Sequence, residues 1–335
     1  MPTSAHPYVS KLIDNARLTL EEDDFSVTVI ENNFDQAEQD TQVQQYLASG
    51  DKPAGILWFP SDAQASIASL SRLSGLGVPI VQVNQRPLPE SEDYFTAFAG
   101  ISDLVAGENI GNGLIAARDA MEADGKQLHS PGGNVLVVTG PVGFGASIDR
   151  ITGFEEATAG AGFNVLATIN SPALTPDATY TEVSQSLQGP LAEGIDLVFT
   201  FNDDVSTGTL RALTEAGLTP GVDVAVSNGV CNGRGTATSS GDVFSTVAQS
   251  PEYEGTLSAS VLKTLIGNGG ELSDEETHQL PDDADAVPDL SFTPAKYNYV
   301  PLPPIMGAFD DPAASAENVA AFKLWGQGVD TLCDF

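Results

Sequence analysis

The fold is decided by one stretch, residues 196–217, which reads DLVFTFNDDVSTGTLRALTEAG. Its first part, 197–201, is a short apolar and β-branched run, typical of a strand buried on both faces of a parallel sheet. Residues 202–204 are polar and can cap a helix start. Apolar residues then recur at helical spacing until a glycine ends the pattern. The stretch therefore places Asn202 and Asp203 at the carboxyl end of a strand, the edge where open α/β sheets bind ligands.

The same alternation of strand and helix fills most of the chain. Further strands are predicted at 25–30, 54–59, 78–83, 94–99, 135–139, 163–169, 222–227 and 243–248. Further helices are predicted at 7–21, 35–48, 62–73, 103–123, 148–159, 180–191, 253–266 and 313–325. The pattern occurs twice, before and after a seam near residues 100–103. It indicates an α/β protein with two similar doubly wound parallel-sheet lobes joined by a hinge.

The division of the chain follows from this seam. We expect residues 1–101 plus 251–280 to form the N-terminal lobe and 102–250 the C-terminal lobe. The Pro-rich remainder, 281–335, is interpreted as a strap that crosses the lobes. The first lobe opens on a loop and a helix, so the strand that should precede them is missing. Because that strand is central in a doubly wound sheet, its loss leaves neighbouring backbone groups unpaired.

The charge of the chain excludes several classes of function. It carries 46 acidic and 13 basic residues, a formal net charge of −33. Such a surface repels phosphate backbones and anionic lipid, which argues against nucleic-acid and membrane-surface roles. The acids are spread in short clusters and indicate a solvated surface, or one adapted to high salt. No apolar run approaches the length of a membrane span. The first residues lack the features of a signal peptide, so the chain as written looks cytoplasmic.

Motifs for catalysis and metal binding are missing from the sequence. The three histidines are scattered without metal-ligand spacing, and no Gly-x-Ser-x-Gly elbow occurs. The glycine-rich loop GPVGFG at 140–145 lacks the ending of a phosphate-binding loop. We therefore expect a binding protein and not an enzyme, with no metal and no cofactor. The two cysteines, Cys231 and Cys333, do not form a CxxC pair, and are either unrelated thiols or one disulfide.

Six short motifs occur in a fixed order. They are HPYV at 6–9, VPIVQVNQR at 78–86, RITGF at 150–154, FNDDVSTGTLRAL at 201–213, VSNG at 226–229 and TVAQSP at 246–251. In this order and spacing the chain, up to about residue 265, resembles the periplasmic sugar-binding proteins of the ribose- and galactose-binding type. These proteins share their type I periplasmic-binding-protein fold with the effector domain of lactose-repressor-like regulators.

The resemblance implies a function and a location. In that family two lobes close on a sugar by a hinge motion and deliver it to a membrane transporter. It implies the substrate-binding component of an ABC-type sugar importer, with a monosaccharide or related polyol as ligand and a membrane permease as partner. It also implies a periplasmic, extracellular or cell-surface location, with the missing strand and an export signal upstream of Met1. Export in turn favours a Cys231–Cys333 disulfide that would pin the strap. The alternatives are the effector-binding part of a repressor-like regulator and a sensory binding protein that feeds a receptor.

A neutral sugar needs planar polar groups around its hydroxyls and an aromatic face against its ring. Residues of these types stand at strand ends or in loops after strands. The candidate ligand-binding residues are His6, Tyr8, Arg86, Arg150, Asn202, Asp203, Asn228 and Gln249. Tyr8 is the candidate for stacking on the ring.

Three of these residues also have a plainer interpretation. Arg150 could pair with a neighbouring carboxylate on its own helix, Asn202 could only cap its helix, and Gln249 could be a hinge residue. Asn228 stands where the family usually has Asp, and Arg86 comes one residue later than in the usual spacing, so the identity of the sugar stays open. Asp103, at the seam, resembles the family's hinge carboxylate.

Overall fold

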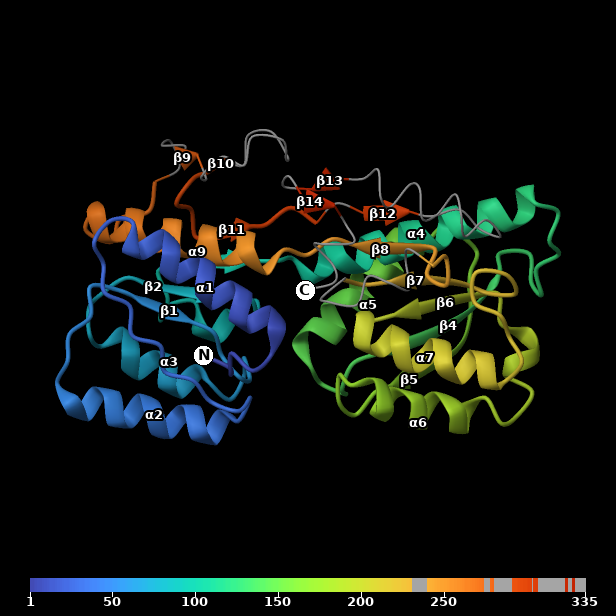
Figure 1. Cartoon of the computed structure of the whole chain (residues 1–335), viewed down its shortest axis with the longest axis horizontal. Helices are drawn as coiled ribbons and strands as arrows, with labels where there is room; N and C mark the ends of the chain where they lie inside the picture. The colour runs from blue at the N-terminus through green and yellow to red at the C-terminus, as the bar shows by residue number, and fades with distance from the viewer. Residues whose placement is uncertain are drawn as a thin grey trace. The chain divides into compact units, whose positions relative to one another are not determined.

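The computed structural model describes residues 1–230, 240–273, 278–279, 291–302, 304–306, 323–324 and 327–328. The chain forms two compact units (Figure 1). Unit 1 comprises Met1–Ser102 and Ser250–Pro301, and unit 2 comprises Asp103–Gln249 and Leu302–Phe335. Each unit contains a largely parallel sheet with helices on both faces. The prediction of an α/β protein with two such sheets is confirmed.

Unit 1 has a four-stranded parallel sheet in the order β1-β2-β3-β11. Its strands are β1 (Ile56–Trp58), β2 (Ile80–Val83), β3 (Ala97–Gly100) and β11 (Tyr297–Tyr299). Its helices are α1 (Pro7–Glu21), α2 (Gln36–Ser49), α3 (Ile67–Ser74), the short η1 (Pro89–Ser91) and α9 (Pro251–Gly267). A separate antiparallel pair joins β9 (His278–Gln279) to β10 (Ser291–Phe292). Helices α1 and α9 lie on one face of the sheet and α2 and α3 on the other (Figure 1).

Local sequence explains where the helices of unit 1 begin and end. Helix α1 has proline in its first turn, where the missing N–H costs nothing. The side chain of Asp35 accepts hydrogen bonds from the backbone N–H groups of Ala37 and Glu38, which caps α2. Gly50 ends α2 in the left-handed conformation. The predicted helix positions therefore hold to within a few residues, apart from the later start of α3.

The predicted strand at 25–30 is not a strand. Phe25, Val27 and Val29 are half-buried while the residues between them are exposed, which is the alternation of a strand, but the segment forms no ladder. Pairing exists only at its end, where the Met1 amino group donates to the carbonyl of Ile30 and Pro2 forms a parallel bridge with Asn32. Strand β1 is the edge of the sheet. The prediction was wrong because a strand needs a partner as well as a pattern.

Unit 2 has a six-stranded sheet in the order β12-β8-β7-β6-β4-β5, parallel except for β12. Its strands are β4 (Asn134–Thr139), β5 (Asn164–Asn170), β6 (Leu197–Thr200), β7 (Ala225–Asn228), β8 (Ser245–Val247) and β12 (Pro304–Met306). Its helices are α4 (Asp103–Ala123), α5 (Gly145–Thr158), α6 (Pro176–Ser186), the short η2 (Ala192–Gly194) and α7 (Asp203–Glu215). The quoted stretch 196–217 is thus a strand, a turn and a helix, as predicted.

Two apolar clusters fill the two faces of the unit 2 sheet. One joins Ile110 and Leu114 of α4 and Phe154 of α5 to the strands, and the other joins Val183 of α6 and Leu213 of α7 to the opposite face. The strands β4 and β6 are fully buried. The apolar run at 197–201 therefore reflects a strand covered on both sides.

The last part of the chain adds one strand to each of the two sheets. Strand β11 belongs to the unit 1 sheet and β12 to the unit 2 sheet. The predicted helix at 313–325 lies outside the described residues except for Lys323–Leu324, which pair as β13 with β14 (Gln327–Gly328). Helix is therefore wrong for those two residues. Both Cys231 and Cys333 lie outside the described residues, so the disulfide stays a prediction.

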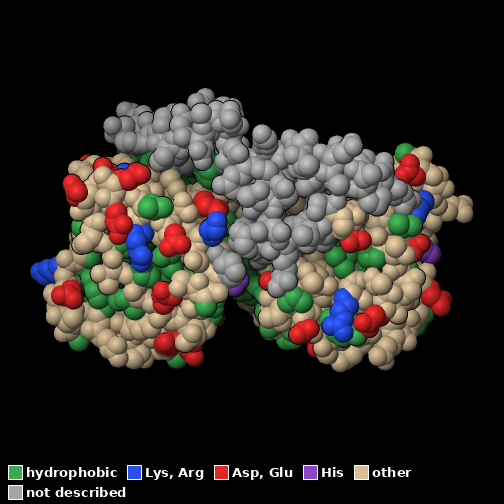
Figure 2. Space-filling view, in the orientation of Figure 1, with side chains coloured by type: hydrophobic (Ala, Val, Ile, Leu, Met, Phe, Trp, Pro, Cys, Tyr) green, Lys and Arg blue, Asp and Glu red, His purple; other side chains and the backbone are tan. Residues whose placement is uncertain are grey.

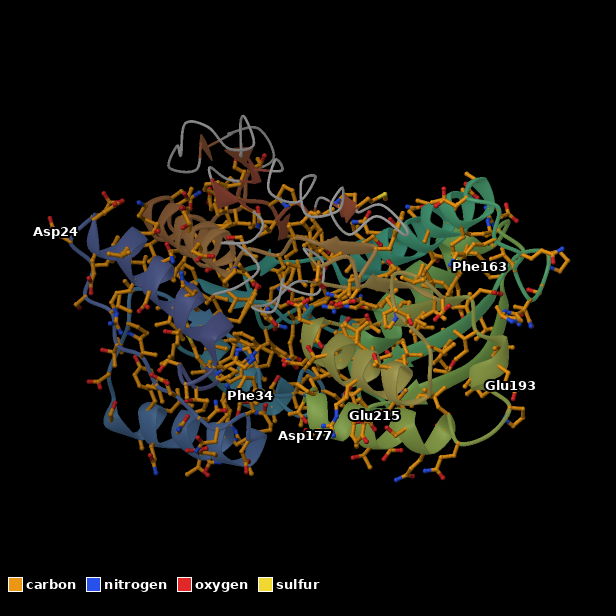
Figure 3. All side chains as sticks on the ribbon, turned by 45° about the vertical axis from the view of Figure 1, so that its right-hand side comes forward. Asp24, Phe34, Phe163, Asp177, Glu193 and Glu215 are labelled. Atoms are coloured by element: carbon orange, nitrogen blue, oxygen red, sulfur yellow. The ribbon has the colours of Figure 1, made fainter. Side chains whose placement is uncertain are left out.

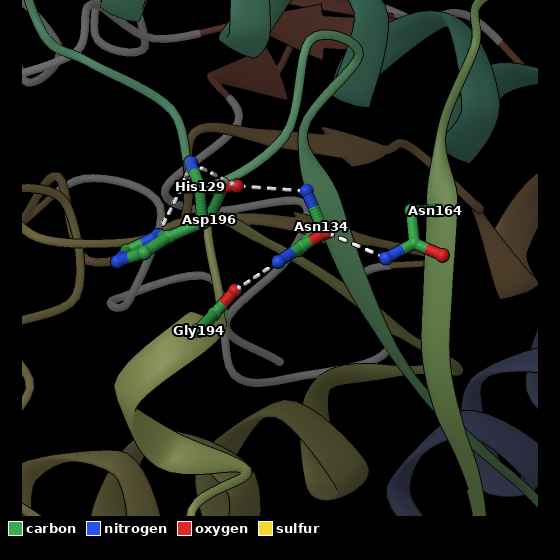
Figure 4. Close-up of polar contacts among 5 residues, drawn as sticks. All are labelled: His129, Asn134, Asn164, Gly194 and Asp196. Carbon is green, nitrogen blue, oxygen red and sulfur yellow. Dashed lines mark hydrogen bonds and ion pairs between the residues drawn. The ribbon is translucent and has the colours of Figure 1, made fainter.

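Polar groups around the buried Asn134 and Asp196 tie together the amino ends of the unit 2 strands (Figure 4). We call these residues, His129, Asn134, Asn164, Gly194 and Asp196, the amino-edge cluster. Asp196, only 3% exposed, accepts from the backbone N–H of Asn134 at 2.7 Å and of His129 at 3.1 Å. His129 Nδ1 lies 2.7 Å from the same carboxylate. The Asn134 side chain bonds the carbonyl of Gly194 and the amide of Asn164. The cluster fixes the starts of β4, β5 and β6.

An exposed polar cluster joins α6 to α7 in unit 2. Arg211 lies 3.3 Å from Glu215 and 3.8 Å from Asp177, and its guanidinium stands 3.8 Å from the centre of the Tyr180 ring. The Tyr180 hydroxyl donates to Glu215 at 2.5 Å. Figure 3 labels Asp177 and Glu215 on the two helices. On the face shown in Figure 2, acidic side chains are dispersed and not gathered in one block.

Candidate functional site

Polar side chains follow three neighbouring strands of unit 2 where each strand ends. Asn202 follows β6, Asn228 is the last residue of β7, and Gln249 comes shortly after β8. Because β6, β7 and β8 are adjacent and parallel, these positions share one edge of the sheet. All three side chains are buried. The structure thus places three of the predicted residues along one edge of unit 2.

Asn202 caps helix α7 and keeps polar capacity beyond the cap. Its Oδ1 accepts from the backbone N–H of Val205 at 3.0 Å. Its NH₂ group makes no hydrogen bond to any residue that the structure describes, although the side chain is only 4% exposed. An amide has two N–H donors, so Asn202 can cap its helix and still donate to a bound molecule. The capping and ligand-binding interpretations are compatible.

The side-chain amide of Asn228 forms hydrogen bonds with other groups of the protein. Its Nδ2 lies 2.6 Å from Asp203 Oδ1, 3.0 Å from Thr246 Oγ1 and 3.2 Å from the carbonyl of Val230. Its Oδ1 accepts from Ser206 Oγ at 3.1 Å. The amide therefore acts by holding the Asp203 carboxylate. An aspartate at position 228 would put two carboxylates at this distance, which explains why an amide suits the position.

Arg150, in α5, is buried against a carboxylate and an aromatic ring. Its Nε and Nη2 donate to Asp103 Oδ1 at 2.8 and 2.7 Å, and its Nη1 donates to the carbonyl of Phe201 at 2.6 Å. The guanidinium lies 4.0 Å from the centre of the Phe201 ring. Three of its five N–H donors are thus used within the described residues. Asp103, at the start of α4, neutralises the buried charge, while its role as a hinge stays a prediction.

Unit 1 contributes a polar cluster built around Glu254, a residue that the sequence motifs did not single out. Tyr8, in the first turn of α1, donates its hydroxyl to Glu254 Oε2. Asn84, which follows β2 with a left-handed backbone (φ 64°), donates its amide to the same oxygen at 3.3 Å. Glu254 is fully buried in the first turn of α9. We call these three residues the Tyr8 cluster.

Two other predicted residues of unit 1 lie differently. His6 occupies the N-cap position of α1 without a capping bond from its side chain, and its ring meets Phe34 edge-on at 5.9 Å. Arg86 is exposed in the loop after β2. In the same loop Gln85 bonds the carbonyl of Pro60. The backbone turn at Asn84 sends neighbouring side chains in different directions, which a motif alone could not reveal.

The described residues contain no group of three His, Cys, Asp or Glu side chains arranged to hold a metal ion. The buried acids Asp103, Asp203 and Glu254 are instead engaged with Arg150, Asn228 and Tyr8 respectively. The chemistry that these arrangements support is hydrogen bonding to a polar uncharged molecule. No helix in the described part of the chain has both the length and the apolar character needed to cross a bilayer.

Two α/β units with polar side chains at strand carboxyl ends define a ligand-binding protein of the doubly wound class. Comparison with known sequences gives the family. The chain belongs to the periplasmic binding protein family, whose domain matches residues 1–271. This confirms the predicted family, and with it a binding protein and not an enzyme. The proteins of this family are periplasmic.

Individual relatives agree with this assignment. The ribose import binding protein of Escherichia coli is 26% identical over 253 residues, covering 76% of this chain and 78% of the relative. That of Bacillus subtilis is 25% identical over 244 residues, covering 72% and 71%. The fold is similar to that of a periplasmic ribose ABC transporter protein from Conexibacter woesei, with a TM-score of 0.72 at 18% identity over 100% of this chain and 95% of the other. It is also similar to a solute-binding protein from Agrobacterium radiobacter in complex with D-arabinose, with a TM-score of 0.70 at 18% identity over 94% and 96%.

Proposed function

We propose that this protein is the substrate-binding component of an ABC-type sugar importer and that it binds a monosaccharide or a related polyol. The observation that carries the proposal is the set of buried polar side chains along the carboxyl edge of the unit 2 sheet. Asn202 and Arg150 are held rigidly there and retain N–H donors beyond those that the described protein groups use. The relatives named for ribose import support a sugar as the ligand class.

The chemistry of each group matches a part of a sugar. The Asn202 amide and the Arg150 guanidinium would donate to sugar hydroxyl oxygens. The Asp203 carboxylate, held by Asn228, would accept from a hydroxyl group, and the Tyr8 ring would cover an apolar face of the sugar ring. Contacts by His6, Arg86 and Gln249, and closure of two lobes about Asp103, stay predictions.

The partner and the location follow from the same proposal. An importer component hands its sugar to a membrane permease and works in the periplasm or at the cell surface. The Cys231–Cys333 bridge belongs to this proposal. Counting free thiols in the unfolded, unreduced protein tests it.

Thermal unfolding against a sugar panel tests the function itself. The panel holds D-ribose, D- and L-arabinose, D-allose, D-galactose, D-fucose and ribitol, with amino acids as controls. A sugar at a hundred times its dissociation constant adds about 2.7 kcal/mol, which raises the Tm by several degrees. We expect one or two panel members to do so. A folded sample that responds to no sugar or polyol would contradict the proposal.

A variant at Asn202 links any such response to the proposed site. Asn202→Ser keeps a side-chain oxygen that can cap α7, because serine and asparagine are about equally good N-caps. It removes the two amide donors. We expect an unchanged Tm without sugar and an affinity lower by roughly tenfold or more, the loss typical of one or two ligand hydrogen bonds. Full affinity in this variant would place the sugar elsewhere.

A further inference from the structure

The fully buried Glu254 is the point where three elements of unit 1 meet. It comes from α9, Tyr8 comes from α1, and Asn84 follows β2. A single carboxylate oxygen, Oε2, accepts from both the Tyr8 hydroxyl and the Asn84 amide. Gly100, at the end of β3, leaves room for it, since a Cβ there would lie 3.1 Å from Glu254 Oε1. A carboxylate so enclosed requires donors around it.

The arrangement fixes what Tyr8 can offer to a bound molecule. A phenol has one O–H donor, and that donor is directed to Glu254. Tyr8 therefore presents its ring and its oxygen lone pairs, but no proton. Asn84 likewise spends one of its two N–H donors on the same oxygen. Glu254, with 0% of its surface exposed, cannot itself touch a ligand. Its influence on binding is therefore indirect, and Tyr8 and Asn84 are the neighbours through which we expect it to act.

We infer that Glu254 is a specificity-determining positioning residue of the sugar site. It holds the Tyr8 ring in place and makes the Tyr8 oxygen an acceptor, so that unit 1 favours a sugar with a hydroxyl proton at that point. Asn84 is oriented by the same carboxylate. The inference rests on the proposed sugar-binding function and adds to it a residue that acts on the choice of sugar from outside the contact surface.

A double-mutant cycle between Glu254 and Tyr8 tests this inference. The variants Glu254→Gln, Tyr8→Phe and their combination are measured by calorimetry against each panel sugar that raises the Tm of the unmodified protein. Glu254→Gln replaces a charged acceptor by an amide that can also donate to the Tyr8 oxygen. We expect it to lower the affinity for the best sugar at least tenfold and to change the order of preference among the panel sugars. In the Y8F background, where no phenol remains to be oriented, the same substitution should change the affinity less than threefold.

Glu252 provides a matched control in the same helical turn. It is paired with the exposed Lys11 at 3.0 Å and lies outside the Tyr8 cluster. Glu252→Gln removes one negative charge from α9, as Glu254→Gln does. It should leave both the affinity and the order of preference unchanged within twofold. If the two variants changed the affinity and the order of preference equally, Glu254 would act only through its charge. That result would overturn the inference.

The remaining outcomes separate the inference from the proposed function. If Glu254→Gln lowers the Tm but the folded protein keeps its affinities and preferences, Glu254 is only structural and the inference is wrong. If the unmodified protein binds no panel sugar, the proposed function fails and the inference falls with it. Should Glu254→Gln not fold, Tyr8→Phe and Asn84→Gly replace it, since glycine accepts the left-handed backbone at position 84. Unchanged preferences in both would then overturn the inference.

Discussion

The two ends of the unit 2 sheet both carry polar clusters that include buried residues, but the clusters are built differently. In the amino-edge cluster, the Asp196 carboxylate accepts from backbone N–H groups, and the Asn134 side chain bonds the Gly194 carbonyl and the Asn164 amide. At the carboxyl edge, Asn202 and Arg150 retain donors beyond those that the described protein groups use. The amino-edge cluster is directed to backbone groups at the strand starts and holds the fold, whereas Asn202 and Arg150 can also donate to a ligand. Burial and polarity alone therefore do not identify a binding site.

The strongest test of this difference is to replace Arg150, which both holds the fold and is proposed to bind the sugar. Arg150→Met takes from the buried Asp103 carboxylate the cation that compensates it, and breaking a buried ion pair typically costs 3–5 kcal/mol. We expect a loss of that size in the free energy of unfolding, measured with urea, together with loss of sugar binding. It is the largest effect that we predict.

A paired substitution separates the two roles of Arg150. Replacing both partners, Arg150→Met with Asp103→Leu, removes the two charges together, and such replacements are often neutral for stability. We expect most of the lost stability to return while sugar binding stays absent. If binding returned as well, Arg150 would be a structural residue only, and the two edges of the sheet would not differ in the way argued above.

The amino-edge cluster should affect stability alone. Asp196→Ala leaves the buried backbone N–H of Asn134 and the part-buried backbone N–H of His129 without their carboxylate acceptor, which we expect to cost about 3 kcal/mol of the free energy of unfolding. Sugar affinity of the folded variant should not change. Asp223→Ala is the control, because Asp223 accepts one backbone N–H at an exposed position, and we expect a cost below about 1 kcal/mol. A change of sugar preference in Asp196→Ala would show that the amino edge also communicates with the ligand.

These two clusters also show how far sequence reasoning reaches. Strand and helix positions follow from local periodicity, so the quoted stretch 196–217 was predicted correctly, as was the place of Asn202 at a strand end. The role of Asp196 was not visible, although it begins that same stretch. Its partners His129 and Asn134 lie 67 and 62 residues away and are brought near only by the fold.

The errors have the same origin in long-range pairing. The segment 25–30 has the pattern of a strand, but a ladder depends on a neighbour that no local pattern supplies. Glu254 looked like one more acidic residue in the first turn of a helix, where such residues are common because they complement the helix dipole. Its burial depends on α1 and β3 closing around it. A sequence motif identifies the position of a residue in the chain. The direction of its side chain depends on how the surrounding elements pack.

The exposed cluster of Asp177, Tyr180, Arg211 and Glu215 on α6 and α7 should have the smallest effect on stability. It tests whether the number of polar contacts or their burial determines that effect. Arg211 and Glu215 are more than half exposed, so screening by water weakens their pairing. The Tyr180 hydroxyl and, to a lesser extent, Arg211 hold the pKa of the Glu215 carboxyl below its ordinary value of 4.5. Because this pKa is depressed in the folded state, the contribution of the cluster is present above pH 4.5 and is lost as the pH falls through the lower, folded value. An NMR titration of the Glu215 carboxyl carbon should give a midpoint below 4.5, which Tyr180→Phe should raise more than Arg211→Gln does. A midpoint at the ordinary value in the unmodified protein would mean that the Glu215 contacts are not kept in solution. In that case burial would decide which polar clusters of unit 2 contribute to stability.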